Sequence, residues 1–165
     1  MAVTFHTNGL VTGNTVKSTG NIIQVVTAST STSMSTSAGS LVDSGLSATI
    51  TPFANSSKIL VMIDSPYHAI RSSGATSTFN IRVLRGSTSV FAGGASESDY
   101  QQGIGGSISS NRMCGMISKT ILDSPSSTSS LTYKLQVQSG YNLTLHMQDS
   151  TTAPVSYTHL RAHET

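Results

Sequence analysis

The stretch LVDSGLSATITPFANSSKILVMI, residues Leu41 to Ile63, decides the fold. From Leu46 to Ile50, apolar residues alternate with serine and threonine, which is the period of a half-buried antiparallel strand. Pro52 ends this strand because proline cannot donate to a ladder, and the triplet from Asn55 to Ser57 is typical of a turn. Ile59 to Ile63 is apolar without interruption, which predicts a second strand that is covered on both faces.

Similar strand patterns recur along the chain. No window keeps a 3.6-residue apolar period, and about a third of the residues are Ser or Thr, which suit strands and loops better than helices. The predicted strands are Ile22–Thr27, Leu46–Thr51, Lys58–Ile63, Thr78–Leu84, Ser89–Phe91, Arg112–Leu122, Leu131–Gln138 and Asn142–Met147. Short turns at Gly86–Thr88 and Ser139–Asn142 predict hairpins. The sequence therefore predicts an all-β fold, an antiparallel, jelly-roll-like β-sandwich.

The chain divides into three parts. Residues 1–20 are rich in Gly, Thr and Asn and are interpreted as an N-terminal arm or linker, residues 21–153 as the sandwich domain, and residues 154–165 as a tail. Within the domain, Ala28–Ser40 is of low complexity and fits either a polar edge strand or a loop. Alternation directs seven side chains into the core: Ile59, Val61, Ile63, Ile81, Val83, Leu135 and Val137.

Four sequence blocks resemble a domain of structural proteins from tailed phages, many of them marine or metagenomic. The blocks are D-x-G-L-S-x-x-I-T-P…S-S-K-I-L-V from Asp43, FNIRVLRG at 79–86, LDSP at 122–125 followed by TYKLQV at 132–137, and GNIIQVV at 20–26. Together they cover about Gly20 to Met147 and carry no catalytic signature. The resemblance implies a non-enzymatic virion module of a tail fibre or appendage. Such a module would be assembled in the bacterial cytoplasm and would present loops to a host-surface glycan or protein.

Val155–Thr165, VSYTHLRAHET, departs in composition from the nearly uncharged body before it. Its back-translation resembles a sequencing adapter read in frame, so we interpret it as an artefactual tail that makes no stabilising contact. The alternative is a genuine polar C-terminus. The artefact reading implies that the natural protein continues past Ala153 and that a final apolar strand is missing from this chain. The natural molecule is expected to be a homotrimer, by analogy with trimeric jelly-roll heads of the tumour-necrosis-factor type, and an unpaired strand edge would then weaken its assembly.

Charge and composition exclude several function classes. The formal net charge is +2, which is too small to suggest a nucleic-acid partner. Arg71, Arg82 and Arg85 are the one local group of basic residues, and a solvated strand face is favoured over a phosphate site. No apolar stretch is long enough for membrane insertion. The single cysteine, Cys114, excludes an intrachain disulfide and is expected to be a small residue of a buried strand.

Neither a metal site nor a catalytic site is evident. His6, His68 and His146 lack a short metal-ligand spacing; His68 is expected in a loop and His146 on the polar face of a strand. A homotrimer could still gather three copies of His146 on its axis. The acidic residues are spread along the chain, and there is no G-x-S-x-G elbow. We therefore expect no enzymatic activity, no cofactor and no bound metal.

Gly93–Asn111 is the longest irregular region, and binding often lies on long loops of a rigid sandwich. Its candidate receptor-contact residues are Glu97, Asp99, Tyr100 and Gln101. The alternative is a variable surface loop without a chemical role. At the level of the whole protein, the alternatives to a virion module are a secreted bacterial adhesin or lectin-like carbohydrate-binding module, and a carbohydrate-active enzyme with a carboxylate cleft.

Overall fold

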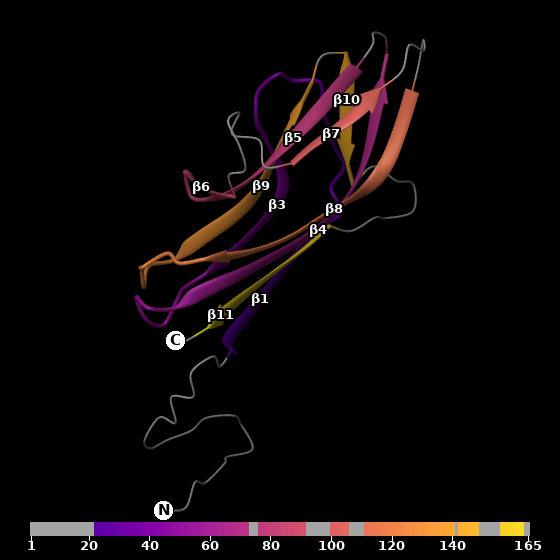
Figure 1. The fold of residues 1–165 in the computed structure, drawn as a ribbon. Helices are drawn as coiled ribbons and strands as arrows, with labels where there is room; N and C mark the ends of the chain where they lie inside the picture. The colour runs from indigo at the N-terminus through magenta and orange to yellow at the C-terminus, as the bar shows by residue number, and fades with distance from the viewer. Residues whose placement is uncertain are drawn as a thin grey trace, which may run out of the picture.

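The computed structural model describes residues 22–72, 76–91, 100–105, 111–140, 142–148 and 156–163. Within these ranges, every regular element is a β-strand, and the strands form two antiparallel sheets (Figure 1). Sheet A contains β1 (Ile22–Thr30), β2 (Met34–Thr36), β4 (Lys58–Arg71), β8 (Asn111–Asp123), β10 (Leu143–Met147) and β11 (Ser156–His163). Sheet B contains β3 (Val42–Ile50), β5 (Thr76–Arg85), β6 (Thr88–Phe91), β7 (Tyr100–Gly105) and β9 (Leu131–Ser139). The predicted all-β antiparallel sandwich is confirmed.

The strand order is that of a jelly roll. In sheet A, β4 pairs with β8 on one side and with β11 and then β10 on the other, and β1 and β2 pair with β11 and β10. In sheet B, β9 lies between β3 and β5, and β5 pairs with both β6 and β7. Three pairs of strands, β1 with β2, β6 with β7, and β10 with β11, can each be counted as one interrupted strand. When the resulting eight strands are numbered along the chain, their spatial order is 1-8-3-6 in sheet A and 2-7-4-5 in sheet B. These are the two sheets of a double Greek key, as the sequence predicted.

β4 continues well beyond the strand that the sequence predicted. It runs through Pro66 to Arg71 and pairs with β8 along nearly its whole length. On its other side, β4 pairs with β11 as far as Asp64 and with β10 from Tyr67 onward, so Pro66 lies between the two pairings. A proline can remain in a strand where one ladder is interrupted, because its missing N–H is not needed there. The prediction that His68 lies in a loop is therefore wrong.

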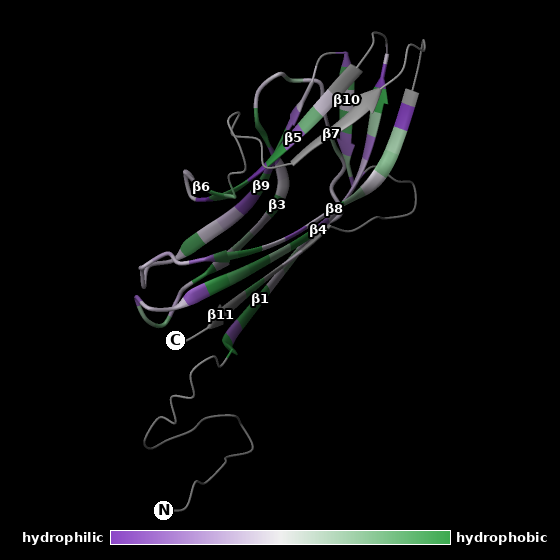
Figure 2. Ribbon diagram, viewed as in Figure 1, coloured by the Kyte–Doolittle hydropathy of each residue, from purple (hydrophilic) through white to green (hydrophobic). Residues whose placement is uncertain are grey.

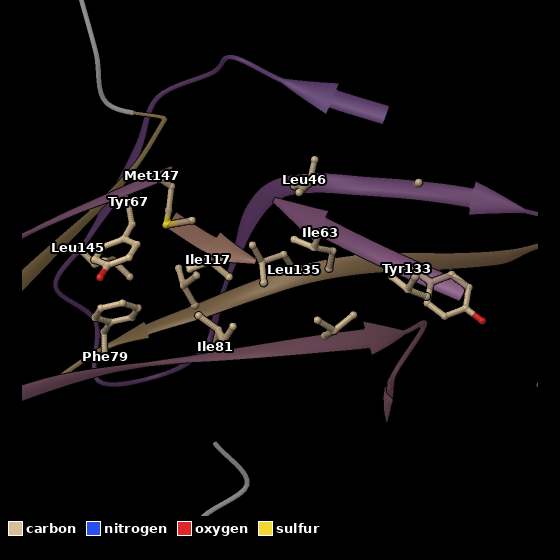
Figure 3. Packing of buried hydrophobic residues seen from close by; sticks show 14 of the residues in the cluster. Leu46, Ile63, Tyr67, Phe79, Ile81, Ile117, Tyr133, Leu135, Leu145 and Met147 are labelled. Carbon is tan, nitrogen blue, oxygen red and sulfur yellow. The ribbon is translucent and has the colours of Figure 1, made fainter. Parts of the chain in front are cut away.

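The core between the sheets matches the predicted set. All seven residues expected to point inward are at most 3% exposed, and they pack with residues of both sheets (Figure 3). β4 alternates strictly between buried and half-buried residues, and Leu60 and Met62 lie on its half-buried outer face. The unbroken apolar run of this strand therefore does not reflect two covered faces, and that expectation is wrong.

An aromatic pair joins the sheets at one end of the core. The rings of Tyr67 in β4 and Phe79 in β5 lie 4.7 Å apart between centroids at 55°, and Figure 3 shows them facing each other. Gly115 of β8 is the register partner of Tyr67. A Cβ added at Gly115 would lie 2.6 Å from the Tyr67 hydroxyl and 2.8 Å from two ring carbons. The Tyr67 ring thus occupies the space that a side chain at position 115 would fill.

The C-terminal segment lies inside sheet A. β11 pairs with β1 on one side and with β4 on the other, from Ser156 to His163. Thr158 and Leu160 are buried, at 3% and 0% exposure, and Leu160 lies between Val26 and Val61 in the register. The prediction that this segment makes no stabilising contact is therefore wrong. It occupies the strand position that the sequence analysis expected to be empty, because an open side of β4 would leave backbone N–H and C=O groups without partners. The adapter-like origin of the segment stays a prediction.

Four further sequence expectations can be compared with the structure. Part of the low-complexity segment is indeed a polar edge strand, since β2 pairs with β10. Part of the long irregular region is a strand, since β7 pairs with β5. The hairpin predicted at Ser139–Asn142 is wrong, because β9 belongs to sheet B and β10 to sheet A, so this connection crosses between sheets. The hairpin at Gly86 is confirmed: β5 and β6 pair from Arg85 and Thr88, and Gly86 has a φ of 57°.

An ionic cluster ties the two sheets together at one end of the sandwich. Asp123, the last residue of β8, accepts hydrogen bonds at Oδ2 from Arg85 Nη1 and from the Tyr133 hydroxyl, each at 2.6 Å. Arg85 and Tyr133 are register partners in sheet B, so one carboxylate of sheet A bridges two strands of sheet B. Burial, and then the hydrogen bond to Asp123 and its negative charge, raise the pKa of Tyr133 above the ordinary value of a tyrosine.

Replacing Leu160 tests whether β11 belongs to the folded core. We expect Leu160→Ala to lower the free energy of unfolding by about 2–5 kcal/mol, because a fully buried leucine side chain is removed. Met116→Ala is the control, since Met116 is 57% exposed and should change stability by about 0.5 kcal/mol or less. Urea denaturation measures both. Equal stability of Leu160→Ala and the wild type would show that β11 does not pack.

Replacing Gly115 tests the contact with Tyr67. We expect Gly115→Ala to destabilise the protein by about 1–3 kcal/mol, because the added methyl group would overlap the Tyr67 ring. Gly39→Ala is the matched control, since a Cβ there meets nothing within 4 Å. Denaturation of the two variants under the same conditions gives the comparison. A Gly115→Ala protein as stable as Gly39→Ala would contradict the close contact.

The ionic cluster predicts a pH-dependent effect of Tyr133→Phe. At neutral pH we expect a loss of about 1–3 kcal/mol, because Asp123 loses a buried hydrogen-bond donor. The raised pKa means that folding favours the neutral phenol. Its contribution is therefore complete below the ordinary tyrosine pKa of about 10 and is lost as the pH rises above it. Denaturation from pH 7 to 11 should show the gap between wild type and variant narrowing above about pH 10; a constant gap would contradict the assignment.

Candidate functional surfaces

The two outer faces of the sandwich differ in chemistry. Among the residues whose exposure is described, the exposed large apolar side chains lie on sheet A or in the loop between β3 and β4. They are Ile22, Ile23, Val25, Phe53, Met116 and Leu122. β4 carries a long hydrophobic run (Figure 2), and its outward residues in that run, Leu60 and Met62, are half-buried. Sheet A therefore presents apolar side chains outward as well as inward.

Two of these exposed residues, Val25 and Leu122, lie in one row across sheet A. Val25 of β1 pairs with Arg161 of β11, Arg161 with Leu60 of β4, and Leu60 with Leu122 of β8. Val25 is 54% exposed and Leu122 59% exposed, with Leu60 between them. Adjacent strands lie about 4.8 Å apart, so this row spans about 14 Å. The two exposed apolar residues thus lie at the ends of a row whose inner positions are Arg161 and the half-buried Leu60.

Sheet B presents hydrogen-bonded polar side chains instead. Asp43 of β3 forms a 2.9 Å ion pair with Lys134 of β9 and accepts a 2.6 Å hydrogen bond from Gln136 Nε2. The hydrogen bond from Gln136, followed by that from Lys134, lowers the pKa of the Asp43 carboxyl group below its usual value. This face therefore carries an ionised carboxylate that its neighbours hold in place.

Amide side chains continue this polar face toward β7. Asn80 Nδ2 of β5 donates a 3.2 Å hydrogen bond to Gln138 Oε1 of β9, and Gln138 Nε2 donates one to the carbonyl of Gly39. On the other side of Asn80, its register partner is Gln101 of β7. Planar amides, each with donors and acceptors, thus occupy neighbouring positions on β5 and β9.

The predicted receptor-contact residues are placed only in part. Tyr100 and Gln101 begin β7, where they pair with Ile81 and Asn80 of β5. Glu97 and Asp99 lie outside the described residues. The structure therefore places half of the predicted site beside the amide row, and the receptor-contact role of these residues stays a prediction.

His146 and Cys114 both lie on the outer face of sheet A. His146 is half-buried on β10, as predicted, while Leu145 and Met147 beside it are fully buried. Cys114 is exposed, so the expectation of a buried small residue is wrong. Ile117 of β8 is fully buried and points into the core. Side chains alternate along a strand, so Cys114, three positions away, points outward. His6 lies outside the described residues.

The predicted arginine group does not form. Arg71 ends β4 in sheet A and is fully buried, whereas Arg82 and Arg85 belong to β5 in sheet B. Arg82 is half-buried, and Arg85 binds Asp123 of the ionic cluster. The expectation of a solvated strand face is therefore wrong for Arg71.

Two other kinds of site are absent from the part of the chain that the structure describes. No group of three or more His, Cys, Asp or Glu side chains is arranged to hold a metal ion. No helix long and apolar enough to cross a membrane is found among the same residues.

Comparisons with known proteins are weak. No family model matches the sequence, and no curated protein matches it. A structure of the Gx strain of infectious bursal disease virus is 10% identical, with a TM-score of 0.38, and covers 98% of this chain and 46% of that chain. The VP2 subviral particle of the same virus is 12% identical, with a TM-score of 0.32, and covers 86% of this chain and 38% of that chain. This chain therefore spans less than half of either protein, and likeness at this level carries no argument about function.

Proposed function

We propose that this chain is a non-enzymatic structural module of a virion, in a tail fibre or appendage of a tailed phage. Two observations support the proposal. The sequence blocks between Gly20 and Met147 resemble such proteins, and the strand order is a jelly roll, an architecture common in viral capsid and lectin domains. A fold alone does not establish a function, and the chemistry of the two outer faces supplies the further support.

The single observation that carries the proposal is the apolar outer face of sheet A. Val25 and Leu122, at the two ends of the row, are exposed and Leu60 is half-buried, although the same sheet already buries a complete core on its inner face. The chain has few charged residues, at 10%, so little charge repulsion opposes the association of copies. We propose that this row packs against neighbouring copies in a homotrimer.

The polar face would then point away from the assembly. In this arrangement, the outer face of sheet B and the region from Glu97 to Gln101 are presented to a host-surface glycan or protein. The amide pair Asn80 and Gln138, with Asp43 held as a carboxylate, supplies the donors and acceptors that such a contact needs. The proposal requires no cofactor, no nucleic acid and no membrane insertion, and it places the chain in the virion after assembly in a bacterial cytoplasm.

The same amide row favours a second candidate, a secreted adhesin or lectin-like carbohydrate-binding module. Jelly rolls also occur in lectins, and planar amides beside a carboxylate can bind sugar hydroxyl groups. The two candidates differ in sheet A: a monomeric lectin would not need the exposed row from Val25 to Leu122, whereas the virion module does.

The oligomeric state in solution tests the proposal. We expect the wild type to form trimers, and Leu122→Glu to shift them to monomers, because a buried charge without a partner opposes packing of the row. Ser47→Glu is the matched control, since it adds the same charge to an exposed site on sheet B. Light scattering coupled to size-exclusion chromatography measures the mass of each protein.

Two outcomes would contradict the assembly surface. A wild type that stays monomeric at all accessible concentrations would remove the reason for the exposed row and favour the lectin-like candidate. If Ser47→Glu dissociates the trimer as strongly as Leu122→Glu, the contact does not lie on sheet A.

A further inference from the structure

Three residues that can bind metal ions occupy one row across sheet A. His146 of β10 is the register partner of His68 of β4, and His68 is the register partner of Cys114 of β8. His68 and His146 are half-buried and Cys114 is exposed on the outer face. The sequence separates the two histidines by 78 positions, so only the strand register brings them together.

The two imidazoles are already in contact. Their ring centroids lie 5.3 Å apart with an angle of 24° between the planes. Directly opposite residues of antiparallel strands have Cβ atoms about 4.5–5.5 Å apart, which holds both side chains to one small region. A tetrahedral Zn²⁺ with bonds of about 2.0–2.1 Å needs ligand nitrogens about 3.3 Å apart. Rotation about the side-chain bonds of the two stacked rings has to bring one nitrogen of each ring to this spacing.

The surroundings suit a site with two protein ligands. Along β4, Pro66 and Ile70 flank His68 on the outer face and offer no side-chain ligand, and on the other side of β10 the register partner of His146 is Ser35 of β2. The described residues hold no ready-made group of three ligands, so two positions of a tetrahedral ion would be filled by water, one more than at open zinc sites with three protein ligands. Neutral imidazole suits the borderline divalent ions, among them Zn²⁺, Cu²⁺ and Ni²⁺.

We propose that His68 and His146 form a cross-strand chelate for a borderline divalent transition-metal ion. The ion links β10 to β4 close to the position where the partner of β4 changes from β11 to β10. Bound metal therefore stabilises the end of sheet A where pairing with β4 starts anew after Pro66.

Zinc titration of the metal-free full chain by calorimetry tests this proposal. We expect one Zn²⁺ per chain, with affinity lowered by about tenfold or more in both His68→Asn and His146→Asn. His159→Asn is the matched control: its register partner is Met62, six residues along β4 from His68, or about 20 Å away. Its affinity should equal that of the wild type.

The outcomes that overturn the proposal are specific. Absence of zinc binding by the wild type does so, as does unchanged affinity in both His68→Asn and His146→Asn. Loss of binding in Cys114→Ser or His159→Asn, with binding retained in His146→Asn, assigns the ion elsewhere. If a variant fails to fold, NMR of the wild type decides instead: zinc has to shift the imidazole resonances of both His68 and His146, and shifts confined to other histidines overturn the proposal.

Discussion

Pairing along β4 is the constraint on which the rest of the sandwich depends. This strand of 14 residues runs the length of sheet A, and each side of its backbone needs partners, since unpaired N–H and C=O groups beside a core are costly. β8 meets that need on one side without a break. On the other side, β4 pairs with two separate strands, β11 and β10, and Pro66 lies between the two pairings. The positions of β1 and β2 follow, because they pair with β11 and β10.

This arrangement gives the molecule two outer faces with different chemistry. On sheet B, outward polar side chains bind one another, as in the ion pair of Asp43 with Lys134 and the hydrogen bond from Asn80 to Gln138. Sheet A leaves Val25 and Leu122 exposed across a row that its own strands do not cover. In the proposed homotrimer, sheet A would pack against neighbouring copies and sheet B would face solvent or a ligand.

Contacts between positions far apart in sequence give particular residues their surroundings. Tyr67 and Gly115 meet because β4 and β8 are in register, and the glycine provides the space that the ring fills. The same register, one residue further along β4, places His68 opposite Cys114 on the other face. Asp123 reaches Arg85 and Tyr133 because β8 ends at the same end of the sandwich as β5 ends and β9 begins. Each of these pairings depends on how strands align.

The sequence by itself determined the fold class, the eight predicted strands and the direction of the core side chains. Alternation along a strand is local, so Ile59, Val61 and Val137 could be assigned to the core without knowledge of their neighbours. The tertiary structure alone decided that β4 passes through Pro66, that Cys114 is exposed and that His68 lies beside His146. It also decided that Ser156–His163 enters sheet A, although Thr158 and Leu160 already alternate with polar residues in the sequence. Of the candidate site, only Tyr100 and Gln101 were placed, beside a row of amides that no local pattern revealed. The physical reason is that strand partners and register are set by backbone pairing between distant segments, which local periodicity does not encode.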